Sequence, residues 1–157
     1  MCLSIYLGTT SPISIPKASP GHLGVEEASW KPPPLRRNHS FVYYLGVQGT
    51  DRELACSCLL LEHVDWTEAG TVVHTDALYP DEPPCPFDAL KALCDEATKD
   101  GGFATIVCDD SGGVEQTCSE EDYCTSGLVR LDSIARGNLL FADVSGGIPW
   151  RVLHVVR

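Results

Sequence analysis

The sequence has no long hydrophobic run. Although 43% of its 157 residues are hydrophobic, none of its apolar runs approaches the ~20 residues of a membrane-spanning helix. The first residues also lack the basic stretch of a secretory signal peptide, and the short run 3–7 is followed at once by polar residues and proline. The sequence therefore predicts a cytoplasmic protein with no membrane segment, folded as a single domain over residues 1–157.

Basic residues are also scarce. The chain has 11 Lys and Arg against 22 Asp and Glu, which gives a formal net charge of −11. A negative surface repels phosphate backbones and anionic lipids, so we expect neither nucleic acid nor a membrane as a partner. The same charge suits a soluble protein that meets a cation or a basic protein partner.

Cysteine, in contrast, is plentiful. The eight cysteines are Cys2, Cys56, Cys58, Cys85, Cys94, Cys108, Cys118 and Cys124. Their share, about 5% of the chain, is below the ~8–10% of a disulfide scaffold, and the predicted compartment is reducing. Several stand at apolar positions of regular patterns, which indicates reduced, buried thiols that pack as small hydrophobic groups.

The hydrophobic patterns predict an α+β fold with about five or six strands, largely antiparallel, and one principal helix. The helix is expected to begin at Pro86 and to end at Gly101-Gly102. The residues rich in β-formers or in alternating hydrophobics are 3–7, 41–47, 54–61, 103–108, 139–144 and 148–156.

Two hairpins are expected within this set. The first joins 41–47 to 54–61, and the apolar run 54–61 should be central in the sheet. The second joins 139–144 to 148–156 and starts at a sheet edge, because Pro149 cannot donate a ladder hydrogen bond. Residues 12–37 hold six prolines and little periodicity, which predicts a long surface loop anchored by Leu23 and Trp30.

A thiol cluster is the first candidate site. Residues two apart on a strand share a face, so Cys56 and Cys58 would present their sulfurs side by side. If the first strand lies alongside, Cys2 joins them, and His39 is a candidate fourth ligand. Thiolates and imidazole suit zinc or another soft metal. Simple packing of these cysteines in the core remains the alternative.

Cys2 is also a candidate nucleophile. We expect Met1 to be removed, which would leave the thiol of Cys2 beside its own α-amine as a base. The Met1-Cys2 start resembles the N-terminal-nucleophile hydrolases such as the class II glutamine amidotransferases, which begin Met-Cys-Gly-Ile. This chain has Leu3 and Ser4 in place of the glycine and isoleucine, so the resemblance covers two residues only.

An acidic turn is the third candidate. The run 109–113, Asp-Asp-Ser-Gly-Gly, follows an expected strand and carries carboxylates that can hold Mg²⁺ or Ca²⁺. It does not complete an EF-hand loop, and these residue types are common in plain turns. Among the histidines, no pair has metalloprotease spacing, and His154 alternates with hydrophobic residues, which favours a packed or half-buried role.

A longer resemblance rests on three segments. The start Met1–Gly8, the segment His39–Gly46 and the motif Cys56-Ser57-Cys58 resemble a family of small bacterial proteins with a Met-Cys-Leu start, a Tyr-Tyr strand and a Cys-x-Cys motif. The resemblance implies a bacterial cytosolic protein and no particular activity. Ala55 and Leu59 stand where members have glycine, which favours core packing over metal binding.

Taken together, these patterns predict a non-enzymatic binding or interaction protein, with a soft-metal or redox thiol site at Cys2, Cys56 and Cys58. Two alternatives remain open. One is a small cysteine hydrolase or transferase that uses Cys2 as its nucleophile. The other is an acidic inhibitor or immunity-type protein that covers a basic partner, since complementary charge steers such an association.

Overall fold

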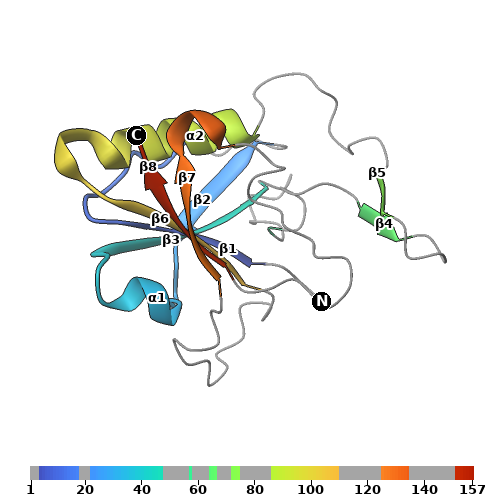
Figure 1. Cartoon of the computed structure of the whole chain (residues 1–157), viewed down its shortest axis with the longest axis horizontal. Coiled ribbons are helices and arrows are strands. Elements are labelled where there is room, and N and C mark those ends of the chain that lie inside the picture. Colours follow the sequence, from blue (N-terminus) through green and yellow to red (C-terminus); the bar gives the residue numbers. More distant parts are fainter. Residues whose placement is uncertain are drawn as a thin grey trace.

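The computed structural model describes residues 4–17, 22–47, 57, 64–66, 72–74, 86–109, 125–134 and 151–157. This part of the chain has the α+β fold that the sequence predicts, with a six-stranded, mostly antiparallel open sheet and one principal helix (Figure 1). In chain order its elements are β1 (Ser4–Thr9), β2 (Leu23–Glu27), α1 (Pro33–Arg36), β3 (Phe41–Val47), β4 (Val64–Trp66), β5 (Val72–His74), α2 (Pro86–Thr98), β6 (Ala104–Asp109), β7 (Thr125–Arg130) and β8 (Arg151–Val156).

β1 lies inside the sheet, whose strand order is β2-β3-β1-β6-β8-β7. It pairs antiparallel with β3 along one edge and with β6 along the other, so segments far apart in the chain meet around it. β7 and β8 run parallel to each other. β4 and β5 form a separate two-stranded antiparallel sheet. Successive residues of a strand face opposite sides, so the register decides which side chains share a face.

The face of the main sheet that α2 covers, here called the α2 face, holds the larger core (Figure 1). Ile5 and Leu7 of β1 point to this face and are almost fully buried. The α2 residues that pack against them recur at helical spacing, and they are Leu90, Leu93, Cys94 and Ala97. This apolar stripe, rather than intrinsic propensity, holds the helix on the sheet.

The opposite side of the sheet, the α1 face, is covered by the chain between β2 and β3. Leu35 of α1 is fully buried there against Tyr6, Val42, Val107 and Val152. α1 starts at Pro33, where proline is tolerated because the first-turn amide has no partner within a helix. Figure 1 shows α1 and α2 on opposite sides of the sheet, so both of its faces carry apolar side chains.

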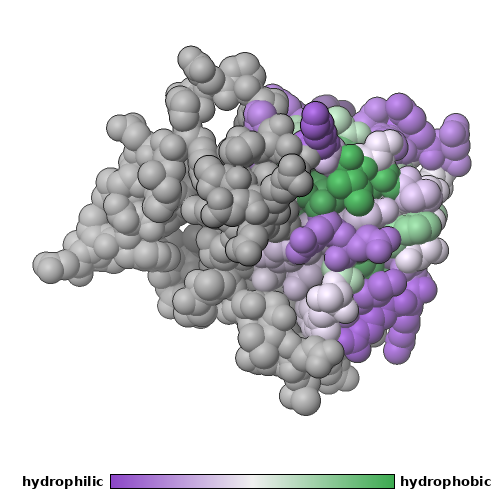
Figure 2. All heavy atoms as spheres, turned by 180° about the vertical axis from the view of Figure 1, so that it is seen from behind, coloured by the Kyte–Doolittle hydropathy of each residue, from purple (hydrophilic) through white to green (hydrophobic). Residues whose placement is uncertain are grey.

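α2 ends where the sequence predicts. After Thr98 the chain makes a 3-10 turn, Lys99–Gly101, in which Asp100 and Gly101 have φ of 54° and 81°. This left-handed conformation terminates a helix and suits glycine. In the described part of the chain, no helix has the length and apolarity needed to cross a membrane. Seen from behind, hydrophilic residues cover most of the described surface, with one larger hydrophobic area (Figure 2).

The predicted hairpin between 41–47 and 54–61 is wrong, and most of the predicted strand 54–61 lies outside the described residues. β3 pairs with β2 along one edge and with β1 along the other, so no edge is left for another strand. Ser57, the described residue of this segment, lies in a 3-10 turn. The apolar run misled the prediction because a short run of this kind fits a central strand and other buried segments equally well.

The segment 12–37 differs from the single surface loop that its prolines predict. It contains β2, which forms an edge strand on β3, and the short helix α1. Leu23 and Val25 of β2 are buried in the α2 face. The alternation of these two residues with Gly24 and Glu26 is a strand pattern, and the surrounding prolines concealed it.

The predicted C-terminal hairpin, which joins 139–144 to 148–156, is also wrong for the residues of β8. This strand lies inside the sheet, with β6 on one edge and β7 on the other, so a segment 139–144 cannot pair with residues 151–154. β7 was not predicted, because Gly127 and the polar residues around it weaken its hydrophobic alternation. After β7 the chain makes a 3-10 turn, Leu131–Ser133.

Candidate functional site

Three side chains of the α1 face stand at one level on neighbouring strands. Glu26 of β2 is the register partner of Tyr44 of β3, and Tyr44 is the register partner of Tyr6 of β1. Partners across antiparallel strands have Cβ atoms about 4.5–5.5 Å apart. A carboxylate and two phenol rings therefore form a row that runs from the edge of the sheet to its interior.

The next level of the same face carries very little side-chain volume. Gly24 of β2 is the register partner of Gly46 of β3. Ser4 stands at the corresponding position of β1, one residue before Ile5, which pairs with Leu45. Because protein interiors are otherwise closely packed, small residues next to large aromatic ones leave a hollow in the face.

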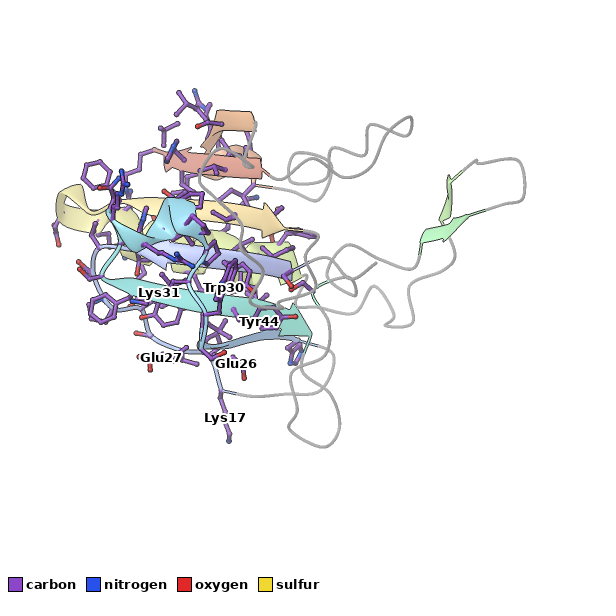
Figure 3. All side chains as sticks on the ribbon, turned by 90° about the horizontal axis from the view of Figure 1, so that it is seen from below. Lys17, Glu26, Glu27, Trp30, Lys31 and Tyr44 are labelled. Atoms are coloured by element: carbon purple, nitrogen blue, oxygen red, sulfur yellow. The ribbon has the colours of Figure 1, made fainter. Side chains whose placement is uncertain are left out.

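Trp30 closes one side of this hollow. The amide of Ala28 donates a hydrogen bond of 2.9 Å to the Val42 carbonyl, which continues the β2–β3 ladder up to the turn that carries Trp30. The indole packs edge to face on Tyr6, with ring centroids 5.6 Å apart, and Tyr6 packs in the same way on Tyr44 at 5.6 Å. Figure 3 shows Trp30 and Tyr44 close together, near Glu26.

The result is a pocket of about 200 Å³. Its described lining residues come from β1, β2, β3 and the turn after β2, and they are Ser4, Tyr6, Glu26, Ala28, Ser29, Trp30 and Tyr44. Tyr6 is buried, Trp30 and Tyr44 are half-buried, and Glu26 is exposed. The pocket thus combines aromatic walls with a solvent-accessible carboxylate.

Arg36 of α1 holds Trp30 from outside the pocket. Its guanidinium carbon lies 5.9 Å from the centroid of the Trp30 ring, within the range of a cation–π contact. The Nε of Arg36 donates a hydrogen bond of 2.7 Å to the Lys31 carbonyl. Arg36 is not among the described residues that line the pocket, so α1 serves here to fix the indole.

Ser57, the central residue of the Cys-Ser-Cys motif, lies at the start of β1 next to this pocket. Its hydroxyl accepts a hydrogen bond of 2.9 Å from the Ile5 amide and donates one to the Leu45 carbonyl, so it bridges two register partners. Its amide donates a 3.3 Å hydrogen bond to the Tyr44 hydroxyl. Ser57 is fully buried, and these bonds anchor the motif beside the aromatic row.

A second polar arrangement crosses the α1 face near Gly8, two residues along β1 from Tyr6. His39 Nε2 lies 2.9 Å from Thr105 Oγ1, and the same oxygen lies 3.1 Å from His154 Nδ1. A hydroxyl has one proton, so Thr105 donates to one imidazole and accepts from the other. His39 and Thr105 are buried and His154 is exposed, so a hydrogen-bonded chain leads from the interior to solvent.

These surroundings disfavour the charged form of His39. Burial lowers the pKa of His39 below its ordinary value of 6.5, and the nearby His154 lowers that pKa further. The Leu35 backbone acts in the opposite direction, but no group in the described part of the chain makes a well-formed hydrogen bond with His39 Nδ1.

Of the four residues of the thiol site that the sequence predicts, the structure describes only His39. Cys2, Cys56 and Cys58 lie outside the described residues, so their role as ligands, and that of Cys2 as a nucleophile, stay predictions. His39, the proposed fourth ligand, lies beside Gly8, whereas Ser57 lies beside Ile5, three residues or about 10 Å away along a strand.

Two further findings bear on the predicted chemistry. Among the residues that the structure describes, no group of three or more His, Cys, Asp and Glu side chains is arranged to hold a metal ion. Of the acidic turn 109–113, Asp109 ends β6 and the rest lies outside the described residues. Cys94 and Cys108 are both buried, as expected for thiols that pack as small hydrophobic groups.

Sequence reasoning missed the aromatic pocket. It noted Trp30 as an anchor and the tyrosine pair as part of a strand, but it did not connect Glu26, Tyr44 and Tyr6. The available signal was the pattern of large and small residues on one face of three strands. That pattern becomes visible only when the register aligns Gly24 with Gly46.

Comparisons of the chain with protein-family models, with curated proteins and with solved structures find no match. The fold and the site themselves define a class: an α+β protein whose sheet carries an aromatic-walled pocket on the face opposite its principal helix.

Proposed function

We propose that this protein is a non-enzymatic binding protein whose ligand occupies the aromatic pocket. The observation that supports this proposal is the convergence of Tyr6, Tyr44 and Trp30, from three separate segments, around a hollow of about 200 Å³. Aromatic side chains offer a large contact area with few rotatable bonds, so they bind ligands at low entropic cost.

The chemistry of the lining favours binding over catalysis. Its described polar groups are the Glu26 carboxylate and the hydroxyls of two serines and two tyrosines. No histidine, cysteine or lysine is among these described lining residues, so this part of the lining offers no paired nucleophile and base of the kind that covalent catalysis uses. Such a site selects a ligand by shape and charge.

A fragment screen followed by NMR tests the proposal. We expect fragments that bind to shift the Trp30 indole N–H and the amides of β1 and β3 around Tyr6 and Tyr44. Trp30→Leu should abolish these shifts, because it removes one aromatic wall. Phe103→Leu is the matched control, since Phe103 is an aromatic residue, 68% exposed, that does not line the pocket. Shifts that persist unchanged in Trp30→Leu would contradict the proposal.

A thiol-based site is the second candidate function, and one observation favours it. The hydrogen bond between the Ser57 hydroxyl and the Ile5 amide joins the motif that contains Cys56 and Cys58 to the strand that follows Cys2 in the chain. Closely spaced thiolates are ligands for zinc and other soft metals. On this proposal, the pocket and the thiols are adjacent parts of one binding region.

Metal analysis of protein purified without oxygen tests this second candidate. We expect about one equivalent of metal in the wild-type protein and its loss in both Cys56→Ser and Cys58→Ser. Cys94→Ala is the matched control, because Cys94 is buried on α2 in the core of the opposite face. Wild-type protein that carries no metal, and takes up none when zinc is added, would exclude the candidate.

A further inference from the structure

We propose that the ligand of the aromatic pocket is a small organic cation, an alkylated ammonium head group of the choline type. This inference rests on the proposed function, since it names the chemical class that the same pocket would accept. It is carried by three features of the pocket: the arrangement of its rings, the charge at its mouth and its size.

The rings supply the first argument. Aromatic faces carry negative potential and attract cations within about 6 Å of the ring centroid, most strongly for tryptophan. Trp30, Tyr6 and Tyr44 follow one another edge to face, with interplanar angles of 62° and 63°. All three rings line the same pocket, and aromatic rings around one pocket are what bind quaternary ammonium groups in aromatic cages.

The protein itself already shows that Trp30 receives a cation. The Arg36 guanidinium lies 5.9 Å from the centroid of the indole ring. Arg36 Nε donates a hydrogen bond to the Lys31 carbonyl, and Arg36 is not among the described residues that line the pocket. The described walls of the pocket therefore include no basic side chain.

The charge at the mouth supplies the second argument. Glu26 is exposed on the edge strand, directly across from Tyr44, so its carboxylate can approach a charged head group that lies against the rings. An anionic ligand would be repelled by this carboxylate, and the net charge of −11 draws cations toward the molecule. A neutral ligand without a hydrogen-bond donor would make no use of Glu26.

The size of the pocket supplies the third argument. Sites for drug-sized ligands measure roughly 300–1,000 Å³, whereas this pocket measures about 200 Å³. It is therefore suited to a compact head group and too small for an extended molecule. A compact, apolar-surfaced cation also has a low cost of desolvation compared with a primary ammonium, which is strongly hydrated.

Titration with two molecules of equal shape tests the inference. Choline and its neutral carbon analogue, 3,3-dimethylbutan-1-ol, differ by one charge. We expect choline to bind the wild-type protein at least about 10-fold more tightly than the alcohol at low salt, measured by calorimetry and by the Trp30 indole signal in NMR, because cation–π attraction and the carboxylate both act on charge alone.

Matched variants test whether choline binds in the aromatic pocket. Glu26→Gln should weaken choline binding about 2- to 5-fold, as for an exposed charge, and leave the neutral alcohol unchanged. Glu27→Gln is the control, because Glu27 is the next exposed residue of β2 and points to the opposite face. Trp30→Leu should weaken choline binding about 3- to 30-fold, and Trp30→Phe should restore part of it.

The possible outcomes separate this inference from the proposed function. Equal binding of choline and the alcohol in the pocket would overturn the cationic ligand and leave the pocket as a binding site. Choline binding that Glu26→Gln and Trp30→Leu do not change, in variants with wild-type circular dichroism spectra, would also overturn it. If neither molecule nor any screened fragment perturbs Trp30, both proposals fail together.

Discussion

At the scale of single residues, Gly8 makes the buried histidine possible. A Cβ placed on Gly8 would lie 2.7 Å from Leu35 Cδ2 and 2.9 Å from His39 Cγ, closer than packed carbon atoms approach. Both neighbours are buried, so neither side chain can move into solvent. Because Gly8 has no side chain, His39 and Leu35 of α1 can pack closely against the sheet at this position.

Gly8→Ala is therefore expected to destabilise the protein by about 1–3 kcal/mol, as overpacking of a core does. Denaturant unfolding followed by circular dichroism measures the change. Gly127→Ala is the control, because a Cβ there would meet Leu153 Cδ2 at an ordinary 3.5 Å and should change stability by less than about 1 kcal/mol. Equal effects of the two substitutions would contradict this explanation of Gly8.

His39 should make the stability depend on pH. Since burial lowers its pKa below 6.5, the unfolded chain binds a proton at acidic pH that the folded protein does not bind. Stability should therefore fall as the pH drops through about 6.5, and the contribution should vanish above that range, where His39 is neutral in both states.

Urea unfolding at a series of pH values between roughly 7.5 and 5.5 measures this dependence. The loss of stability should be smaller in His39→Gln than in the wild-type protein. His22→Gln, which removes a histidine outside the His39–Thr105–His154 chain, should keep the wild-type dependence. A pH dependence that is the same in His39→Gln and the wild type would show that His39 does not cause it.

At the scale of elements, the packing of α2 on the sheet buries a cysteine and so lowers its reactivity. Cys94 sits on the stripe of α2 that packs on the sheet, and burial raises the pKa of its thiol to about 12. At pH 8 about one molecule in 10,000 would carry the thiolate, which is the reactive form. The role of Cys94 is therefore to fill space in the core.

Folded protein treated with iodoacetamide at pH 8 should remain unmodified at Cys94, whereas protein in denaturant should be modified completely at the same residue. Peptide mass mapping reads out each site separately. Cys108, which is also buried, should behave in the same way, so it serves as a second measure of core protection. Rapid modification of Cys94 in the folded state would contradict the predicted burial.

The elements also differ in how well the sequence predicts them. β1, β3, α2 and β6 follow from hydrophobic alternation or helical spacing, because each buries one face that its own residues define. β2 and β7 were missed, and the predicted pairing of 54–61 with 41–47 was wrong. In those segments the pattern is weak or ambiguous, so pairing with neighbouring strands decides their structure.

At the scale of the whole molecule, the candidate site is made by strand order. Glu26, Tyr44 and Tyr6 become neighbours because β3 lies between β2 and β1, and Trp30 joins them because the chain after β2 folds back over the same face. Ser57 reaches the same place from a distant segment. No spacing along the chain encodes this set of contacts.

The sequence by itself determined the acidic charge of the chain, the α+β composition, the position of α2 and the alternation of β1 and β3, since these depend on composition and on contacts within a few residues. Only the tertiary structure decided that the α1 face holds an aromatic pocket and a buried histidine chain. The register aligns Glu26, Tyr44 and Tyr6 in one row and Gly24 with Gly46 beside it. This alignment depends on long-range hydrogen bonding that a linear pattern does not contain.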